Sequence, residues 1–305
     1  MTPLDAIATR PVPQLLEEGG AGDQPPKPST RGGGPLASAA KYARIFRIAL
    51  IERMTYRGDF LFGTVLRFLP IVTTILLWRA IYEGSGQSEL GGFRYREMVA
   101  YLLLTNISRM FSSMPGLAAG IAREVREGTL KRYLVQPLDL VGYLLASRIA
   151  HKVAYISMAF LPYAGLFYIC RGYFDGFPDA PTLAAYALSL VLAFLVGFFF
   201  EATVGMVGFW FLEVTSILYI VMTLNYFISG HMLPIDLLPQ PWAGILKVLP
   251  FQYMAYFPAV VFLGKVRGWD LVLHLALELF WVIAFMVLAR TLYRTGLKRY
   301  SAFGG

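Results

Sequence analysis

The chain has 305 residues, of which 57% are hydrophobic and only 15% are charged. Soluble domains contain about 45–50% apolar and about 25% charged residues, so this composition excludes an ordinary soluble domain and is typical of an integral membrane protein. The net charge is +8, but the basic residues flank apolar runs without a nucleic-acid-binding motif, so they indicate membrane topology and contact with anionic lipid, with no nucleic acid as partner.

Residues 1–38 differ from the rest of the chain, because they are rich in proline and glycine and contain no apolar run of the length found in a signal peptide. Such a segment buries too little apolar surface to offset the entropy lost on ordering. We therefore expect residues 1–38 to form a disordered cytoplasmic tail and residues 39–305 to form one transmembrane domain.

Several segments of that domain are apolar enough to cross a membrane, which takes about 20 residues for a hydrocarbon layer of roughly 30 Å. The predicted spans are residues 60–82, 97–121, 142–169, 182–208, 210–230 and 270–293. The predicted fold class is therefore an all-α integral membrane protein with six transmembrane helices. The connection between the fourth and fifth spans is very short, so these two helices are expected to be antiparallel neighbours.

Two other apolar segments do not read as simple spans. Residues 40–57 place apolar side chains at helical spacing with basic residues between them, which predicts an amphipathic helix lying on the cytoplasmic leaflet. Residues 232–264 are broken by Pro234, Pro239, Pro241, Pro250 and Pro258, which excludes one continuous helix. We expect short re-entrant or interfacial helices there, on the outer side, with their backbone covered by protein or facing water.

The distribution of lysine and arginine predicts the orientation. These residues concentrate before the first span, between the second and third spans, and after the sixth span. Cytoplasmic loops carry such an excess, so both termini are expected in the cytoplasm of a multi-pass protein of the plasma (inner) membrane.

No motif in the sequence carries catalytic or metal chemistry. There is no G-x-x-x-x-G-K-[ST] phosphate loop, no H-E-x-x-H motif and no Cys/His cluster, and the single cysteine, Cys170, excludes an internal disulfide. The histidines at 151, 231 and 274 are scattered. A membrane-embedded enzyme stays open only if tertiary structure brings reacting groups together.

The loop between the second and third spans is the most distinctive segment. Residues 123–149 read REVREGTLKRYLVQPLDLVGYLLASRI, short and charged with Gly128 and Pro137 as helix breaks. A charged loop of this kind either docks onto a partner protein or is simply solvated, as expected for a cytoplasmic loop.

Three stretches resemble one known family. Arg126-Glu127-Gly128-Thr129-Leu130 followed by Tyr133-Leu134-Val135-Gln136-Pro137-Leu138 resembles the cytoplasmic coupling segment of ABC-2-type permeases. Leu249-Pro250-Phe251, Tyr253, Tyr256-Phe257-Pro258 and Phe262-Leu263-Gly264 resemble the outer segment before the last span in one ABC-2 subfamily with six spans. The end of the chain, Lys298 to Gly305, resembles the C-terminus of that subfamily, so the resemblance covers roughly residues 40–305.

The resemblance implies a fold and an assembly. The fold has an amphipathic connecting helix, six spans, a cytoplasmic coupling helix and outer re-entrant helices before the sixth span. The assembly pairs this chain with a second permease subunit, the same or related, and with separate ABC ATPase subunits. ATP and Mg²⁺ bind to those ATPase subunits, so no cofactor is expected on this chain, which is not itself an enzyme.

The resemblance also implies which residues take part. The candidates for ATPase coupling are Glu124, Arg126, Glu127, Gly128, Thr129, Arg132 and Pro137. The family's translocation pathway lies at the permease–permease interface, lined mainly by the second and fifth spans. The corresponding residues here are Asn106, Arg109, Phe111, Ser112, Ser113, Thr215, Tyr219, Met222, Thr223, Asn225 and Tyr226.

Polar and charged side chains in spans also have a structural interpretation. Each Ser, Thr or Asn can instead make an interhelical hydrogen bond, which is the commoner case. The intramembrane charges Arg109, Glu201, Glu213 and Glu278 are expected to face a cavity or a partner, with a structural role favoured over cargo contact. Arg109 and Glu213 are a candidate pair, unless Glu213 lies in water near the cytoplasmic end of its span.

The predicted function is ATP-driven export, or movement between leaflets, of a hydrophobic or amphipathic cargo. A pathway rich in Phe, Tyr and Met suits such a cargo without identifying it. The competing functions are an ATP-independent carrier or channel and a membrane-embedded enzyme.

Overall fold

The computed structural model describes residues 68–136, 139–211 and 214–300, together with residues 41, 43–48, 51, 63 and 66. The predicted tail, residues 1–38, and most of the predicted amphipathic helix, residues 40–57, lie outside the described residues. Residues 43–48 are helical, as the amphipathic pattern predicts.

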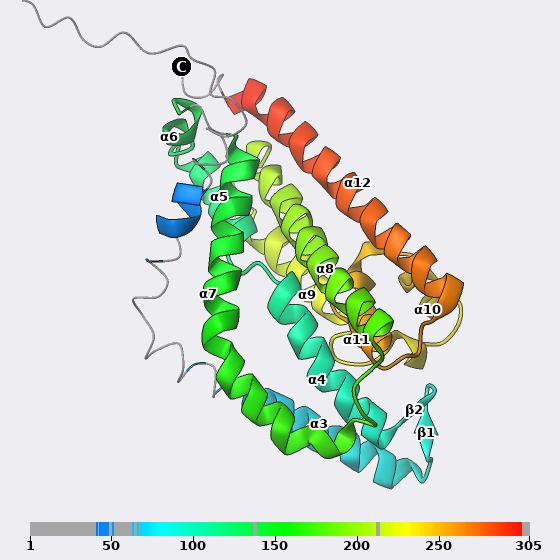
Figure 1. Ribbon diagram of the computed structural model, residues 1–305. Helices are drawn as coiled ribbons and strands as arrows, with labels where there is room; N and C mark the ends of the chain where they lie inside the picture. The colour runs from blue at the N-terminus through cyan, green and yellow to red at the C-terminus, as the bar shows by residue number, and fades with distance from the viewer. Residues whose placement is uncertain are drawn as a thin grey trace, which may run out of the picture. The chain divides into compact units, whose positions relative to one another are not determined.

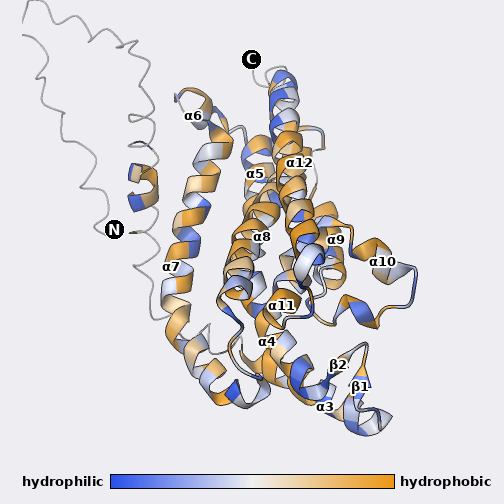
Figure 2. Cartoon of the chain, turned by 45° about the vertical axis from the view of Figure 1, so that its right-hand side comes forward, coloured by the Kyte–Doolittle hydropathy of each residue, from blue (hydrophilic) through white to orange (hydrophobic). Residues whose placement is uncertain are grey.

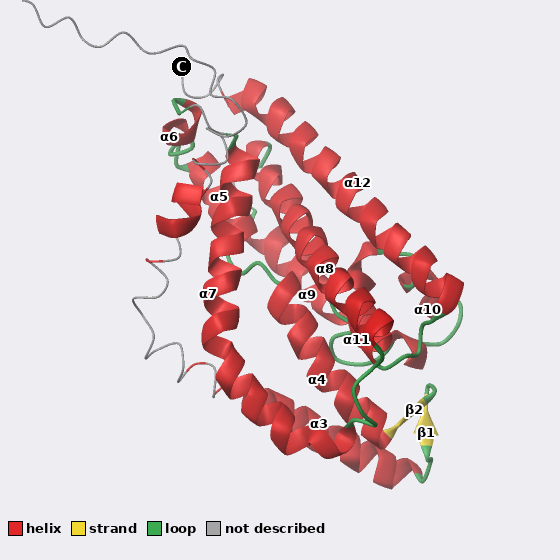
Figure 3. Cartoon of the chain, viewed as in Figure 1, coloured by secondary structure: helices red, strands yellow, loops and turns green. Residues whose placement is uncertain are grey.

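The described chain is helical apart from one short hairpin (Figure 1, Figure 3). The long helices are α3 (Phe68–Ser85), α4 (Tyr95–Ser112), α5 (Leu117–Arg126), α7 (Leu140–Ile169), α8 (Ala180–Met206), α9 (Thr215–Ile228) and α12 (Gly268–Tyr300). The short helices are α6 (Lys131–Leu134), α10 (Trp242–Leu246) and α11 (Tyr256–Phe262), with single 3-10 turns at Cys170–Tyr173, Val207–Phe209, Ile235–Leu237 and Pro250–Met254. Strands β1 (Glu89–Leu90) and β2 (Phe93–Arg94) pair antiparallel between α3 and α4.

Three helical segments are long and apolar enough to cross a membrane by length and composition. They are Leu140–Tyr173, Ala180–Phe209 and Gly268–Tyr300, which match the predicted third, fourth and sixth spans. The protein is therefore an all-α membrane protein, and Figure 2 shows apolar residues along most of α8 and α12 with hydrophilic residues toward the ends. Helix α9 has only 14 residues, about 21 Å of helix, so it is short for a span on its own. The total of six spans stays a prediction.

The predicted second span is not one continuous helix. Helix α4 ends at Ser112, and α5 begins at Leu117. Proline disfavours the helical conformation at the residue before it and lacks a donor N–H, and Pro115 is followed by Gly116, whose φ of 75° is left-handed. We call Ser113–Gly116 the break. It corrects the expectation of an uninterrupted helix over 97–121.

Helix α8 packs against both sides of this break without side chains in between. A Cβ placed on Gly197 would overlap the Ser112 carbonyl, and one on Gly205 would lie 2.9 Å from the Ala118 Cα. Gly208 approaches the backbone of Ala122 in the same way. Glycine permits this distance because it has no Cβ, as at many helix contacts in membranes. The opposite side of α8 packs on α12. Helix α8 therefore contacts α4 and α5 on one side and α12 on the other (Figure 1).

The α8–α12 contact is built from aromatic and aliphatic side chains. The Phe200 ring lies 5.5 Å from both Phe251 and Phe285, and Phe198 is fully buried. By contrast, α7 and α12 expose large apolar side chains on their other faces, such as Leu161 and Phe280. Exposed apolar faces of this kind suit contact with lipid. Figure 1 also shows a bend in α7, which contains Pro162.

Residues 231–264 form short helices, as their prolines predict. Pro250 begins one turn, and Pro258 lies in the first turn of α11, where its missing N–H is not needed. Helix α11 is buried along most of its length. The segment is fastened at Asp236, which accepts hydrogen bonds from Lys247 at 2.5 Å and from the Tyr256 hydroxyl at 2.7 Å. Its position on the outer side of the membrane stays a prediction.

The close contact of α8 with the break gives a stability prediction. We expect Gly197→Ala to lower the free energy of unfolding by about 1–3 kcal/mol, because the new methyl group collides with rigid backbone. Gly165→Ala in α7 is the matched control, since nothing lies within 4 Å of its added Cβ. There the change should be neutral or stabilising by about 0.5–1 kcal/mol. Thermal unfolding in detergent compares the two, and equal midpoints would contradict the packing described.

Candidate functional site

A cavity of about 440 Å³ lies between α4 and α7, beside the break. Its lining combines basic and amide side chains with an apolar and aromatic wall. We call it the basic cavity, and its lining residues are Pro70, Asn106, Arg109, Met110, Ser113, Pro115, His151, Lys152, Tyr155, Tyr163 and His231.

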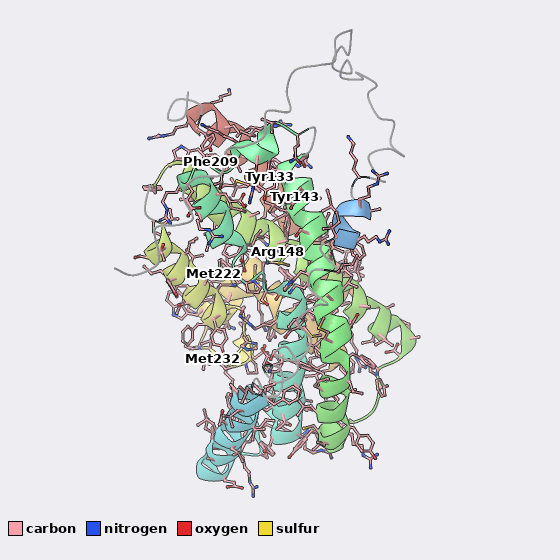
Figure 4. All side chains as sticks on the ribbon, turned by 90° about the vertical axis from the view of Figure 1, so that its left-hand side faces the viewer. Tyr133, Tyr143, Arg148, Phe209, Met222 and Met232 are labelled. Atoms are coloured by element: carbon pink, nitrogen blue, oxygen red, sulfur yellow. The ribbon has the colours of Figure 1, made fainter. Side chains whose placement is uncertain are left out.

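Some of the predicted pathway residues come together at this cavity. Asn106, Arg109 and Ser113 line it. The Tyr226 ring of α9 lies under the Arg109 guanidinium, with 4.9 Å between the guanidinium carbon and the ring centroid. Tyr226 also lines a smaller adjoining cavity of about 80 Å³ with Asn106, His231 and Met232. Met232 is labelled in Figure 4, above α3.

Other predicted pathway residues lie elsewhere. Ser112 is buried and donates a hydrogen bond to the Met254 carbonyl at 2.7 Å, which is the structural alternative for such a residue. Phe111 packs with the core around Tyr101. Among the predicted pathway residues of α9, Met222 packs toward α5 and Asn225 is half-buried, whereas Thr215, Tyr219 and Thr223 are exposed.

Arg109 lies at the basic cavity without an ion pair to a carboxylate among the described residues. Its guanidinium lies over the face of the Tyr226 ring. Such a cation–π contact contributes about 0.5–2 kcal/mol. The candidate partner Glu213 lies outside the described residues, so the proposed Arg109–Glu213 pair is not tested.

Charged side chains from α7 and α8 satisfy the backbone groups of the break. The Lys152 ammonium donates to the carbonyls of Met110 and Ser113 at 2.6 and 2.5 Å. Nη1 of Arg148 donates to the Pro115 carbonyl at 3.0 Å, and the Glu201 carboxylate accepts from the Met114 N–H at 3.1 Å. Helix ends leave such groups without partners, and lipid supplies none. The Glu201 carboxylate therefore has a structural role, because it satisfies the backbone N–H of Met114.

The last predicted intramembrane charge, Glu278, lies on α12 away from the basic cavity. It is fully buried, and neither of its carboxylate oxygens has a hydrogen-bond partner among the described residues. The buried hydroxyl of Ser189 on α8 lies beside it. Glu278 thus belongs to the contact between α8 and α12.

The predicted coupling segment folds into a compact corner between α5 and α6. Nη2 of Arg132 donates to Oε1 of Glu124 at 2.6 Å, and the Tyr133 hydroxyl donates to the same oxygen at 3.3 Å. The hydrogen bond that Arg132 donates to Glu124 raises the pKa of the Arg132 guanidinium. Tyr133 also packs on Tyr143 of α7, with 5.1 Å between ring centroids (Figure 4). Glu124 and Arg132 thus hold the corner together from within.

The outer side of this corner carries other predicted residues. Gly128 has a φ of 71° and turns the chain, and the Thr129 hydroxyl approaches the Glu124 carbonyl at 3.5 Å. Arg126 and Glu127 are exposed. They line a cavity of about 440 Å³ whose other lining residues are Val125, Gly128, Lys131, Gly208, Phe209, Trp210, Phe211, Arg299 and Tyr300. Pro137 lies outside the described residues.

Several cavity residues were not among those predicted from sequence. His151, Lys152, Tyr155 and Tyr163 come from α7, and His231 follows α9. A signal existed for Lys152, because it is a charge inside the apolar run 142–169, one helical turn after Arg148. The carbonyls that accept hydrogen bonds from Lys152 belong to residues about 40 positions earlier in the chain, so only the tertiary structure identifies these contacts.

The hydrogen bonds of Lys152 give a second prediction. We expect Lys152→Met to lower the free energy of unfolding by about 1–3 kcal/mol, because the two carbonyls lose their donor. Arg123→Met is the control, since Arg123 is exposed on α5. Thermal unfolding of both variants in detergent provides the comparison. A Lys152→Met protein as stable as Arg123→Met would mean that the ammonium does not support the break.

Comparison with known proteins agrees with the fold. No curated protein matches the chain. The sequence profile described as ABC-2 family transporter protein matches residues 68–304, from the first residue of α3 to beyond the end of α12. Because this match covers well over half of the sequence, and the described helices include segments able to cross a membrane, the chain belongs to the ABC-2 family of transporters.

Proposed function

We propose that this chain is the permease subunit of an ATP-driven exporter that moves a hydrophobic or amphipathic cargo out of the cytoplasm or between leaflets. Family membership makes it a transmembrane component of an ABC transporter. The observation that carries the finer proposal is the corner between α5 and α6, which is braced internally by Glu124 and Arg132 and leaves Arg126 and Glu127 exposed.

A corner of this kind suits a docking surface. The hydrogen bond between Arg132 and Glu124 holds the backbone of the corner, so the exposed charges of Arg126 and Glu127 present a fixed arrangement to a partner protein. The cavity beside it also includes the end of α12 and the connection after α8. A partner that binds there would contact three parts of the membrane domain at once. We assign this surface to separate ABC ATPase subunits, which bind the ATP and Mg²⁺.

A second permease subunit, the same chain or a related one, completes the proposed assembly. Helix α9 supports this, because Leu218 is its one buried side chain within the described chain, while Tyr219, Ile220, Leu224 and Phe227 are each more than half exposed. A short apolar helix with so little cover suits contact with another subunit. The cargo pathway then lies between the two subunits, near Arg109 and Tyr226.

The proposed orientation places the α5–α6 corner and both termini in the cytoplasm, and residues 232–264 outside. We expect a cysteine introduced by Gln240→Cys, at an exposed position, to react with a membrane-impermeant maleimide added to intact cells. The native Cys170 is buried, and Cys170→Ser removes any remaining background. Reaction of the new cysteine only after the membrane is opened would reverse the orientation.

Coupling to an ATPase is tested by expressing the chain together with an ABC ATPase. We expect the chain to co-purify with that ATPase and to move cargo in liposomes only with ATP. Glu127→Arg should reduce complex recovery and ATP-driven transport at least about tenfold, because like charges meet at a docking surface at a cost of several kcal/mol. The free energy of unfolding should change by less than about 0.5 kcal/mol, since the position is exposed.

The matched control is Glu89→Arg, which makes the same charge reversal at an exposed site in β1. It should leave transport unchanged. If Glu127→Arg behaves like Glu89→Arg, the corner is merely solvated. Cargo movement without any ATP-hydrolysing partner would instead identify a carrier or channel.

A further inference from the structure

The basic cavity is lined by cations and, among the described residues, by no carboxylate. Arg109 and Lys152 line it, and Glu201 of α8 accepts a hydrogen bond from the Met114 N–H at the break. None of the lining residues given above is acidic. An uncompensated charge within a span is costly and usually faces a ligand, a partner or water.

Arg109 is the group whose binding capacity remains unused. Lys152 is committed to two carbonyls. Arg109 contacts an aromatic face, which leaves the edge of the guanidinium, with its fork of N–H donors, available for hydrogen bonds. A guanidinium fork matches the oxygens of phosphate and carboxylate groups in a bidentate manner.

A second observation at the same cavity points to a ligand. The Nδ1 atom of His231 is buried and has no hydrogen-bond partner among the described residues. Buried polar atoms without partners are rare and need an explanation, and His231 lines both the basic cavity and the smaller cavity next to it. A ligand oxygen bound to a proton on this nitrogen would satisfy it.

The rest of the lining defines the shape of the ligand. Pro70, Met110, Tyr155 and Tyr163 supply an apolar and aromatic wall from α3, α4 and α7. Pockets of a few hundred Å³ with a few polar groups on an apolar wall suit small amphipathic ligands. Lys152 is about 18 Å along α7 from its first residue, within the predicted third span, residues 142–169.

We propose that the basic cavity binds the anionic head group, of the phosphate or carboxylate type, of a single amphipathic molecule whose apolar part lies against Tyr155 and Tyr163. This inference rests on the proposed transport function, because it names the class of cargo or lipid that the pathway accepts. Arg109 holds the head group, and Asn106 and His231 supply further polar contacts.

The test measures binding to the full-length chain in nanodiscs of zwitterionic lipid, without ATP or an ATPase. The probe is radiolabelled dodecyl phosphate. We expect saturable binding that dodecyltrimethylammonium, which has the same tail and the opposite charge, does not displace. Inorganic phosphate should compete at least about 100-fold more weakly, because it lacks the tail that the apolar wall contacts.

Substitution of Arg109 separates the head-group contact from general attraction to a basic protein. Arg109→Gln should weaken dodecyl phosphate binding by about 10- to 100-fold, the usual effect of losing a charge-assisted hydrogen bond. Arg109→Lys keeps the charge but loses the fork, so binding should weaken less than in Arg109→Gln. The control Arg79→Gln also removes one positive charge from a predicted span, but Arg79 is paired with Glu83 at 2.8 Å, so binding should change less than about twofold.

A second variant covers the case in which Arg109→Gln fails to fold. Asn106→Asp places a carboxylate in the same cavity and should abolish binding by neutralising Arg109 from within. Wild-type affinity in either folded variant would overturn the proposal, as would equal displacement by the cationic amphiphile. Equal competition by inorganic phosphate would show that the tail does not contribute to binding and would overturn the claim that the ligand is amphipathic. If the wild-type chain does not bind dodecyl phosphate but ATP-driven transport is intact, this inference alone is refuted. If the chain binds dodecyl phosphate but recruits no ATPase in the co-purification experiment, the proposed function alone is refuted.

Discussion

The arrangement of the described helices depends on the break between α4 and α5 and on how its polar backbone is satisfied inside a membrane domain. Lipid offers no hydrogen bonds, so the carbonyls of Met110, Ser113 and Pro115 need donors from the protein. Lys152 and Arg148 on α7 supply them, and Glu201 on α8 accepts from the N–H of Met114. The glycines of α8 allow its backbone to approach the break directly. Helices α4, α5, α7 and α8 are thereby fixed around four residues.

The same solution creates the basic cavity. Cations brought in for the backbone leave an excess of positive charge beside Arg109, and the bend of the chain away from a straight helix leaves room next to it. A structural role for these side chains is therefore compatible with the proposed ligand binding, because the side chains that hold the break also set the electrostatic character of the space beside it.

Much of the fold follows from local sequence, and the site largely does not. Long apolar runs predict α7, α8 and α12, and the prolines of residues 232–264 predict short helices, because both signals act within one turn or span. Pro115 and Gly116 are also a local signal, but a 25-residue apolar window hides so short an interruption. The hydrogen bonds of Lys152, the Ser112 contact with Met254 and the stacking of Arg109 on Tyr226 join distant positions, and periodicity contains no information about such contacts.

The glycine contacts of α8 also have a mechanical consequence. Where two helices touch backbone to backbone, no flexible side chains lie between them to absorb a displacement, so they move as one rigid body. Helix α5 meets α8 in this way at Gly205 and the following 3-10 turn at Gly208, and α8 is packed along α12 on its other side. A push on the exposed end of α5 is therefore carried through α8 to α12. Helix α7 packs less extensively against this unit, so a lever formed by α5, α8 and α12 would swing relative to α7 and alter the width of the space between α4 and α7.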